Sequence, residues 1–318
     1  MRLSPWAKRG CVLLGIVVGV LLSFVLVSHV VASRQEQYAP VGGIDEPRVL
    51  LKSSRHAVFS FPDNYTVDIV DPGHGGFTGF NFWRFVEQNK WEPSTFRVLR
   101  HYCTAEGSYL DFGAWNGVTA LYAAPFAKHV YALEPDPVAW EEVATNVALN
   151  PQYHSRITLY PLCISDARST RTIYGSGGMS DSHIYRNEDM KRKTNALNAI
   201  GEVQCYTLPE FVRLAGLTNL SLIKIDTEGA EVSLLPVAFD YLRQERPSLW
   251  LSFHMPFWPD NIDRDATFNQ LFGTLASIYK YTWGMKTTGN AALNCRAGKG
   301  FCTILFTDKD PANMAEWP

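Results

Sequence analysis

The chain has 318 residues, of which 46% are hydrophobic and 13% aromatic, so it can bury one sizeable core with a small appendage. Its formal net charge is −2, which predicts no broad basic surface, and nucleic acid is therefore not an expected partner. The sequence contains no internal repeat and no long low-complexity tract, which argues against a repeat architecture.

The N-terminal segment departs from this soluble pattern. Residues 10–32, GCVLLGIVVGVLLSFVLVSHVVA, contain no Asp, Glu, Lys or Arg. A run of about 20 apolar residues crosses a bilayer as a helix. Arg2, Lys8 and Arg9 precede the run, and such charges favour the cytosolic side. We therefore expect residues 1–9 to be a cytosolic tail, residues 10–32 to be a transmembrane signal-anchor, and the remainder to be luminal, with type II topology.

The alternative is a cleaved signal peptide. Val30 and Ala32 satisfy the small-residue rule for cleavage, but the apolar run is longer than the roughly 7–15 residues usual in such a peptide. Two Asn-X-Ser/Thr triplets, beginning at Asn64 and Asn219, fit a glycosylated luminal domain. Together these features predict a membrane protein of the Golgi or endoplasmic reticulum. They predict no oligomeric state.

The six cysteines do not predict a disulfide framework. Cys11 lies in the apolar run, and the five others cannot all pair within one chain. Cys295 and Cys302 flank a glycine-containing turn and could form one bridge, with free half-buried thiols as the alternative. No spacing of Cys and His resembles a zinc site.

Two segments precede the main domain. Residues 33–58 are polar with scattered Gly and Pro, and we interpret them as a stem or linker. Residues 59–106 contain aromatic residues at irregular spacing, and FNFWRFVEQNKW and PSTFRVLRHYC have helical character. We expect this second segment to be a helical cap that packs on the main domain.

From residue 107 to residue 318 strands and helices alternate. The predicted strands are SYLDFG, HVYALEP, ITLYPLCIS, LSLIKID, SLWLSFH and GFCTILFTD, and the first two helices are VTALYAAPFA and DPVAWEEVATNVALN. Strands that are apolar on both faces and alternate with helices are typical of a mostly parallel sheet between helical layers. The polar, glycine-containing segment 167–202 interrupts the rhythm, and loops of that length are usually functional or disordered.

Two glycines, Gly113 and Gly117, follow the first of these strands. They allow a tight turn and let a ligand approach the backbone at the carboxyl edge of the sheet. Glu134 ends the second strand, 21 residues after Gly113, where an acid can accept two hydrogen bonds from ribose hydroxyls. The pattern predicts a ligand that contains a nucleoside. The alternative is purely structural, with glycines for turn geometry and acids as solvated strand ends.

The loop between the glycines decides which nucleoside is expected. It reads GAWNG and lacks the G-x-G-x-x-G fingerprint that holds the pyrophosphate of NAD. Asp111, just before it, would repel a phosphate but attract an ammonium or a sulfonium group. S-adenosylmethionine has a ribose, no phosphate, a cationic sulfur and an ammonium, so it matches both Asp111 and Glu134. We therefore predict S-adenosylmethionine as the cofactor.

A second motif narrows the family. LIKIDTEGAEVSLL, residues 222–235, places Asp226, Glu228 and Glu231 just past a buried strand, where packing alone hardly justifies three acids within six residues. At this point the chain resembles the FkbM-type methyltransferase family, a class I S-adenosylmethionine-dependent group. The resemblance is carried by LDFGAWNGVTA, YALEPDP, CISD and IKIDTEGAE, and it spans roughly residues 107–255.

The resemblance implies a Rossmann-like α/β fold over residues 107–318, with a mostly parallel seven-stranded sheet and helices on both faces, preceded here by the single transmembrane helix. Asp111, Gly113 and Gly117 match the first donor-binding motif, and Glu134 matches the ribose-binding acid. Many members have Asn directly after Gly-Ala. This chain has tryptophan there, with an asparagine next.

The remaining matches lie at later strand ends. Asn116 is the donor-loop asparagine just mentioned, and Asp136 falls beside the adenine edge. Asp166, with Ser165 before it, falls at the third strand end, where such folds contact the adenine amino group. Asp226 and Glu228 fall at the fourth strand end, facing donor and acceptor.

The chemistry requires a proton acceptor if the methyl acceptor is an alcohol. A base must lie within about 2.6–3.2 Å of the hydroxyl. The candidates are Asp226, Glu228 and His254, which ends the fifth strand. A satisfied structural histidine and a donor-side structural carboxylate are the alternatives. The three could also ligate an ion, but nothing in their spacing requires one, and no metal site is predicted.

The acceptor side is less defined. Phe257 and Trp258 could line an acceptor site or pack as core or lid. GSGGMSD, within 167–202, could close over the donor, and residues 190–193, MKRK, could meet an anionic acceptor or form a solvated basic turn. The family resemblance and the luminal topology suggest a hydroxyl on a glycan or other hydroxylated metabolite as acceptor.

Other functions were weighed on their motifs. A type II glycosyltransferase would use Asp-X-Asp to hold a metal ion and a nucleotide diphosphate, and Asp263-Arg264-Asp265 and Asp308-Lys309-Asp310 fit the letters but not the expected order. A non-catalytic luminal binding module would keep the fold without its chemistry. A reductase of the NAD type would need the missing phosphate fingerprint.

Overall fold

The computed structural model describes residues 55–71, 79–175, 177–178, 182–184, 198–259, 261–284 and 301–314. These residues belong to one compact unit that spans residues 42–318. The predicted cytosolic tail, the transmembrane segment 10–32 and nearly all of the predicted stem lie outside the described residues, as do Cys295 and the basic residues 190–193. Among the helices that are described, none is long and apolar enough to cross a membrane.

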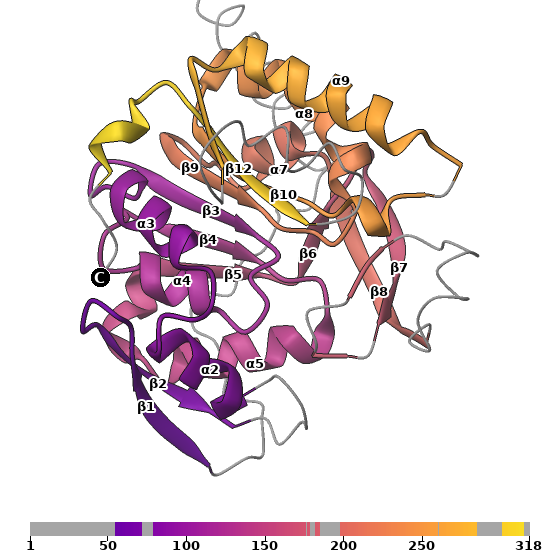
Figure 1. Ribbon diagram of the computed structural model, residues 1–318. Coiled ribbons are helices and arrows are strands. Elements are labelled where there is room, and N and C mark those ends of the chain that lie inside the picture. The colour runs from indigo at the N-terminus through magenta and orange to yellow at the C-terminus, as the bar shows by residue number, and fades with distance from the viewer. Residues whose placement is uncertain are drawn as a thin grey trace, which may run out of the picture. The chain divides into compact units, whose positions relative to one another are not determined.

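A seven-stranded sheet forms the centre of this unit (Figure 1). Its order is β11-β12-β10-β9-β3-β4-β5. The strands are β3 (Ser108–Phe112), β4 (Val130–Leu133), β5 (Ile157–Tyr160), β9 (Leu220–Ile225), β10 (Ser248–Phe253), β11 (Tyr281–Gly284) and β12 (Cys302–Thr307). The five neighbouring strands β10, β9, β3, β4 and β5 are paired in parallel, and β12 is antiparallel to both of its neighbours. The predicted Rossmann-like, mostly parallel seven-stranded sheet is confirmed, with an antiparallel strand near one edge.

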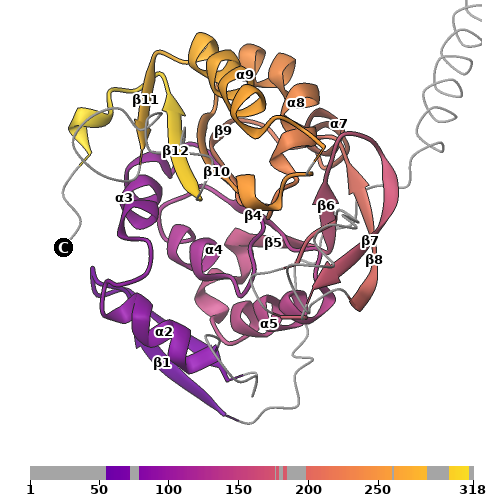
Figure 2. The ribbon, with the colours of Figure 1, turned by 45° about the vertical axis from the view of Figure 1, so that its right-hand side comes forward.

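Helices cover both faces of this sheet (Figures 1 and 2). On one face lie α3 (Pro93–Tyr102), α4 (Val118–Ala123) and α5 (Pro137–Ala148), and on the other α7 (Leu208–Leu214), α8 (Glu231–Glu245) and α9 (Arg264–Ile278). The start of α5 follows from its sequence, because the Asp136 carboxylate accepts hydrogen bonds from two N–H groups of the first turn and Pro137 fits the first helical position. Double coverage explains why every residue of β3 and β10 is buried.

Parts of the predicted long loop, residues 167–202, form strands of a second sheet. It consists of β6 (Leu162–Ile164), β8 (Asn198–Tyr206) and β7 (Ser169–Gly175), in that order, and β7 and β8 lie side by side in Figure 2. The interpretation of 167–202 as one loop is therefore wrong at both ends, and residues 185–197 lie outside the described part. The predicted strand ITLYPLCIS is also split, because Pro161 offers no N–H to continue a ladder and the two halves join different sheets.

One disulfide strengthens the second sheet. Cys163 of β6 and Cys205 of β8 lie directly opposite each other in the parallel pair and are joined by a disulfide. The sequence analysis did not identify this pair, because 42 residues separate the two cysteines and no spacing rule connects them. Cys103 is buried and free.

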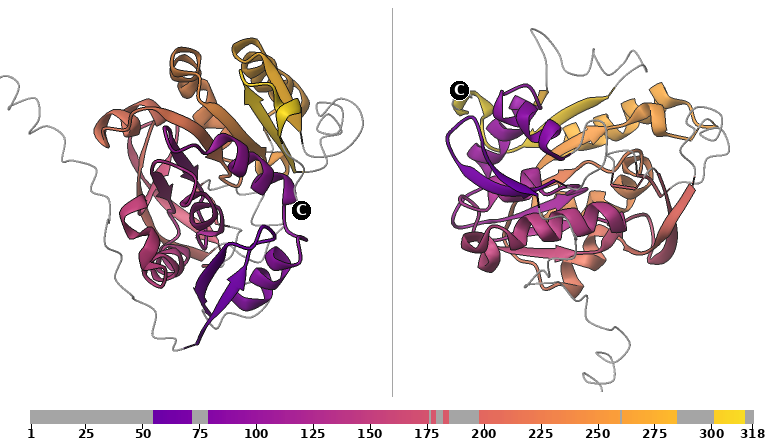
Figure 3. Two further views of the ribbon diagram at one scale, coloured as in Figure 1. Left: turned by 90° about the vertical axis from the view of Figure 1, so that its left-hand side faces the viewer. Right: turned by 90° about the horizontal axis from the view of Figure 1, so that it is seen from below.

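The segment before the main domain contains a hairpin that the sequence analysis missed. β1 (His56–Ser60) and β2 (Thr66–Val70) pair in antiparallel fashion, followed by α2 (Gly79–Glu87) and α3. Figure 3 shows the hairpin and α2 grouped together. The expected helices are confirmed, but the helical interpretation is wrong before residue 71. Short strands of five residues around a turn give too little periodicity to be distinguished from a stem.

Two asparagines, Asn146 of α5 and Asn150 just after its end, form hydrogen bonds to this hairpin. The Asn146 Oδ1 accepts a hydrogen bond of 2.9 Å from the Val70 N–H. Asn150 accepts from the Asp68 N–H at 3.0 Å and donates to the Asp68 carbonyl at 2.8 Å. The side chains thus complete the backbone hydrogen bonding of the outer edge of β2. Below the hairpin an aromatic cluster that includes Phe61, Trp83, Phe96 and Tyr122 joins it to α3 and α4.

Candidate active site

A cavity of about 470 Å³ lies at the carboxyl ends of the central strands. Its walls come from the loop after β3, the ends of β4 and β9, the residue after β10, and the disulfide-linked β6. Two further wall segments are residues 91–92, before α3, and residues 301–303, at the start of β12. The lining residues include Trp91, Glu92, Gly113, Trp115, Glu134, Lys224, Asp226, Glu228, His254, Phe257, Phe301 and Thr303. In open α/β sheets, ligands bind at this edge.

The glycine loop is fixed by close backbone packing. Gly113 has φ +78°, and a Cβ there would lie 1.9 Å from the Asp226 carbonyl oxygen, so only glycine fits. Gly117 has φ +87°, and its Cβ would lie 2.7 Å from a methyl group of Val143. Gly113 lines the cavity, whereas Gly117 turns the chain into α4 against α5. Glycine is therefore required at the two positions for different structural reasons.

Glu134 presents its carboxylate to the cavity from the end of β4. Oε2 accepts a hydrogen bond of 2.7 Å from the Trp115 N–H, and Oε1 accepts one of 2.9 Å from the Asp136 N–H. Each oxygen keeps a lone pair for a further donor. Burial raises the pKa of Glu134 to about 8, although these two backbone N–H groups oppose the shift. A carboxylate in this position gains from any ligand hydroxyls that donate to it.

Asp111 has a different environment from the one expected. Its side chain is fully buried and is not among the cavity-lining residues. It accepts a hydrogen bond of 2.6 Å from the Thr119 hydroxyl and lies 3.3 Å from the Lys224 ammonium. Burial raises the pKa of Asp111, and Lys224 opposes that rise. The carboxylate is thus engaged inside the protein, and a contact with a cationic ligand group stays a prediction.

Lys224 links the two halves of the site and was not singled out from the sequence. Its ammonium lies 3.3 Å from Asp111, 3.3 Å from the Asp226 carboxylate and 3.2 Å from the Gly113 carbonyl oxygen. Burial alone would lower the pKa of Lys224, but the two carboxylates outweigh burial and raise it. The available signal was a lysine inside the apolar strand LSLIKI. A buried cation there requires acidic partners.

The other predicted donor residues surround the cavity without lining it. Asn116 is buried, and its Oδ1 accepts from the Val118 N–H at the start of α4. Asp136 caps α5 and also accepts from the Gly178 N–H at 2.9 Å and from the Ser182 hydroxyl. Ser165 donates to the adjacent Asp166, whose carboxylate pairs with Arg171. Their ligand contacts stay predictions.

Trp115, at the position where the sequence departs from the family pattern, bridges two parts of the site. It adopts a left-handed backbone conformation with φ +49°. Its N–H bonds Glu134, and its Nε1 donates to the Gly178 carbonyl oxygen at 3.0 Å. The expected closing segment GSGGMSD, residues 175–181, is therefore tied to the glycine loop through Gly178, one of its described residues.

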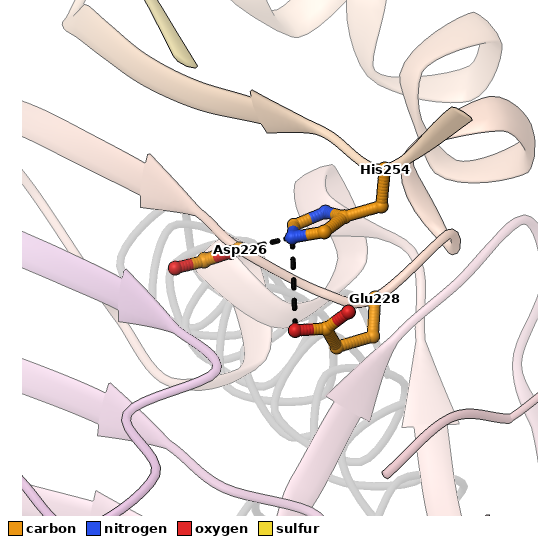
Figure 4. A group of neighbouring side chains, drawn as sticks. All are labelled: Asp226, Glu228 and His254. Carbon is orange, nitrogen blue, oxygen red and sulfur yellow. Dashed lines mark ion pairs between the residues drawn. The ribbon is translucent and has the colours of Figure 1, made fainter. Parts of the chain in front are cut away.

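The three base candidates meet at the other end of the cavity (Figure 4). His254 Nε2 lies 3.2 Å from Asp226 Oδ1 and 3.6 Å from Glu228 Oε1. One potential ligand atom from each residue lies within 4.8 Å of the other two. Glu228 has φ +50° in the tight turn after β9, and His254 directly follows β10. The sequence placed all three at strand ends, and the parallel pairing of β9 and β10 brings them together.

The charges in this cluster are strongly coupled. Burial alone would lower the pKa of His254, but the hydrogen bond to Asp226 and the negative charges of Glu231 and Glu228 outweigh it and hold the pKa well above the ordinary value. Burial would raise the pKa of Asp226, yet Lys224 and His254 hold it below its ordinary value. Without a ligand the cluster therefore contains an imidazolium between carboxylates.

Glu92 is a site residue that the sequence analysis missed. It lies at the start of α3 with φ +36°, and its carboxylate accepts a hydrogen bond of 2.8 Å from the Thr95 hydroxyl. It lines the same cavity, next to Trp91. Burial and the nearby charge of Asp226 raise the pKa of Glu92. No local signal distinguishes this glutamate from an ordinary residue at a helix start.

The two aromatic residues proposed for the acceptor site, Phe257 and Trp258, have different environments. Trp258 is fully buried, and its Nε1 donates to the Glu231 carboxylate at 2.9 Å, so it belongs to the core. Phe257 lines the cavity together with Phe301, and the centroids of their rings lie 5.5 Å apart. Phe301 has 61% of its surface exposed.

The two Asp-X-Asp triplets have structural roles elsewhere. Asp263 caps α9, and Asp308 forms a two-point ion pair with Arg246. Asp310 caps the short helical turn η3 (Pro311–Asn313). None of these acids lines the described cavity. The metal-dependent glycosyltransferase alternative therefore loses the motifs on which it depended.

Comparisons with known proteins were made for the sequence and for the structure. Residues 111–273 match the family model described as the methyltransferase FkbM domain. No curated protein matches the chain. Among solved structures, the chain is similar to methyltransferase FkbM from Methylobacillus flagellatus KT, with 14% identity, a TM-score of 0.41, and coverage of 70% of this chain and 52% of that one. The chain thus spans about half the length of that protein.

Two further solved structures resemble it. An rRNA methylase from Streptococcus thermophilus has 10% identity and a TM-score of 0.35, over 68% of this chain and 95% of that one. Precorrin-6y C5,15-methyltransferase from Geobacter metallireducens GS-15 has 12% identity and a TM-score of 0.35, over 67% of this chain and 86% of that one.

Proposed function

Because the chain belongs to the FkbM methyltransferase family, we propose that it transfers a methyl group from S-adenosylmethionine to a hydroxyl group of a glycan or another hydroxylated metabolite. The observation that carries this proposal is the composition of one cavity. One end holds Gly113 and Glu134, which suit a nucleoside, and the other end holds Asp226, Glu228 and His254, which suit a hydroxylated acceptor. Donor and acceptor would thus meet in one cavity.

The proposed donor fits the chemistry of its end of the cavity. Ribose hydroxyls would donate to the free lone pairs of Glu134, and the Gly113 backbone lets the ligand approach closely. Leu162, Ile164 and Ile173 offer apolar contacts that suit an adenine ring. The loop carries no arrangement for a pyrophosphate, which favours this donor over NAD.

The proposed reaction is an in-line displacement at carbon. The acceptor oxygen forms a bond to the methyl carbon as the carbon–sulfur bond breaks, the sulfonium becomes a neutral thioether, and the hydroxyl proton passes to a carboxylate of the cluster, Asp226 or Glu228. The sulfonium is a good leaving group, so the protein mainly aligns the two atoms and excludes water. Glu228 and His254 would hold the acceptor hydroxyl, while Lys224 keeps Asp226 in place.

We also propose a luminal site for this reaction, in the Golgi or endoplasmic reticulum, with residues 10–32 as a type II anchor. The Cys163–Cys205 disulfide supports an oxidising compartment. Asn64, the first residue of one glycosylation triplet, is exposed in the turn between β1 and β2. A glycosidase-sensitive mass that is lost in Asn64→Gln would support this location, and protease sensitivity from the cytosolic side would overturn it.

The donor is tested by calorimetric titration of the full chain with S-adenosylmethionine and S-adenosylhomocysteine. We expect both to bind and Glu134→Gln to weaken them about tenfold, because the amide can no longer accept at both oxygens. Glu245→Gln is the matched control, since Glu245 is exposed at the end of α8. NAD and sugar nucleotides are titrated alongside.

The outcomes separate the remaining functions. Binding of a sugar nucleotide or NAD in place of the methyl donor would overturn the proposal. Donor binding without label transfer to any glycan or small hydroxylated acceptor would favour the non-catalytic binding module. Transfer of labelled methyl to a glycan hydroxyl would identify the acceptor class.

A further inference from the structure

The cluster at the acceptor end of the cavity has the geometry of a metal site. We propose that Asp226, Glu228 and His254 bind one divalent cation through one carboxylate oxygen each and the imidazole Nε2. These atoms converge from the turn after β9 and the end of β10, all within 4.8 Å of one another (Figure 4). Ligand atoms at about 2.0–2.2 Å from a shared ion are separated by roughly 3 Å when they are neighbours in an octahedron. The two histidine–carboxylate distances, 3.2 and 3.6 Å, require little movement.

The histidine geometry is poorly explained by an ion pair alone. Both carboxylates face the same ring nitrogen, Nε2, and a single N–H cannot donate a good hydrogen bond to two acceptors at once. A cation placed between the three atoms can contact all of them. The imidazole would then bind as the neutral ligand, and its proton would leave to solvent.

The opposite side of the imidazole carries a second, independent feature. Nδ1 lies 3.7 Å from the carboxylate of Glu231, which is fully buried. Glu231 is itself fixed by the Trp258 indole, by the Gly229 N–H and by the His254 N–H. A carboxylate behind a metal-binding histidine orients the ring and increases its basicity. The His254 Nδ1 otherwise has no hydrogen-bond partner in the described structure, although the side chain is only 7% exposed.

The neighbouring charge leaves a demand for a cation. Around the cluster, the described carboxylates of Asp111, Asp226, Glu228 and Glu231 outnumber the cationic side chains Lys224 and His254. Buried carboxylates without sufficient positive charge are costly. A divalent ion bound by one imidazole and two carboxylates would balance this excess. Oxygen ligands with a single nitrogen fit Mn²⁺ or Mg²⁺ better than Zn²⁺, which favours nitrogen and sulfur.

The site would select a class of acceptor. Three protein side chains on one side of an octahedral ion leave coordination positions for two oxygens of the methyl acceptor. Two adjacent hydroxyls, as in the vicinal diol of a sugar ring, would fit these positions, and the rings of Phe257 and Phe301 line the same wall. This acceptor role rests on the proposed methyltransferase function, whereas binding of the ion does not.

The test uses Mn²⁺, whose electron paramagnetic resonance signal is large when free and weak when bound. The full chain, purified in detergent and stripped with a chelator, is titrated with Mn²⁺ in the absence and in the presence of S-adenosylhomocysteine. We expect one site per chain, with Asp226→Asn and Glu228→Gln each weakening it at least about tenfold. Asp240→Asn, on the exposed surface of α8, is the matched control. Circular dichroism verifies folding of every variant.

The results distinguish this proposal from the preceding one. Lack of a stoichiometric Mn²⁺ site in a chain that still binds S-adenosylhomocysteine would overturn the metal site and leave the methyl donor intact. A site that survives both substitutions in folded protein would also overturn it. Loss of Mn²⁺ binding in either variant, with unchanged S-adenosylhomocysteine affinity, would support the proposed ligands.

Discussion

The two ends of the cavity are built in different ways. The donor end comes from adjacent segments, the β3 loop and the end of β4, and its polar groups are positioned by backbone hydrogen bonds such as those to Glu134. The acceptor end is assembled from distant parts of the chain, with Trp91 and Glu92 before the matched family region and Phe301 after it. The donor end thus lies inside the matched family region. The acceptor end combines the cluster of Asp226, Glu228 and His254 from that region with walls from outside it.

The largest expected effect is at the contact between the two ends. Gly113→Ala would bring a Cβ to 1.9 Å from the Asp226 carbonyl at φ +78° and should destabilise the protein by about 3 kcal/mol, as well as abolish donor binding. Gly216→Ala is the control, because Gly216 also has a positive φ of +65° but an added Cβ would meet no neighbour within 4 Å. This substitution should lower the free energy of unfolding by about 1 kcal/mol. Denaturant unfolding measures both, and equal losses would show that the close approach is not rigid.

A second substitution should affect only the acceptor end. Glu228→Gln should reduce the methyl transfer rate about 100-fold, because it removes a charge that contacts the acceptor. Donor affinity should stay within about twofold, since Glu134 and its partners are untouched. Single-turnover transfer and calorimetry separate the two readouts. A large loss of donor affinity would show that the two ends are not independent.

Glu92 tests whether the segment before the matched family region contributes to acceptor binding. Glu92→Gln keeps the shape and the hydrogen bond from Thr95, so the fold should be preserved. We expect the KM for the acceptor to rise about 5-fold with donor affinity unchanged, as for loss of one charged hydrogen bond. The exposed Glu106→Gln is the control. An unchanged acceptor KM would remove Glu92 from the acceptor end.

The smallest effect concerns a buried acid that belongs to neither end. Burial raises the pKa of Glu142 in α5 from its ordinary 4.5 to about 8, and Asp71 adds to this shift. The folded state therefore binds more protons than the unfolded state between these values, and stability falls as the pH rises from about 4.5 to about 8. Glu142→Gln should remove about 1 kcal/mol of this fall. Thermal unfolding from pH 5 to 8 measures it, and parallel profiles would contradict it.

The sequence predicted what is local. The strands β3, β4, β9 and β10 and the helices α4 and α5 were predicted from apolar runs and their spacing, and the donor end from Gly113 and Glu134. What it did not predict depends on pairing between distant segments. The split at Pro161 becomes visible only once two sheets compete for its halves, and the short strand β11 has too few residues for a periodic signal.

The same reason explains the site residues that were missed. Glu92 and Lys224 have ordinary neighbours in sequence, and their importance comes from what the fold places beside them. For Asp111 the sequence predicted that the carboxylate would attract a cation, but it did not show that Lys224 lies beside this carboxylate in the folded chain. Burial and pairing of ionisable groups are properties of the folded chain, so residue type and spacing give only a list of candidates.

The asparagines that bind β2 have a further consequence. A strand at the edge of a sheet normally exposes N–H and C=O groups that can pair with a strand of another molecule. Asn146 and Asn150 occupy these groups at Asp68 and Val70. The amide side chains therefore occupy backbone groups of β2 that another strand would need for pairing, and Asn146→Leu would leave the buried Val70 N–H without its partner, at a cost of about 1–3 kcal/mol.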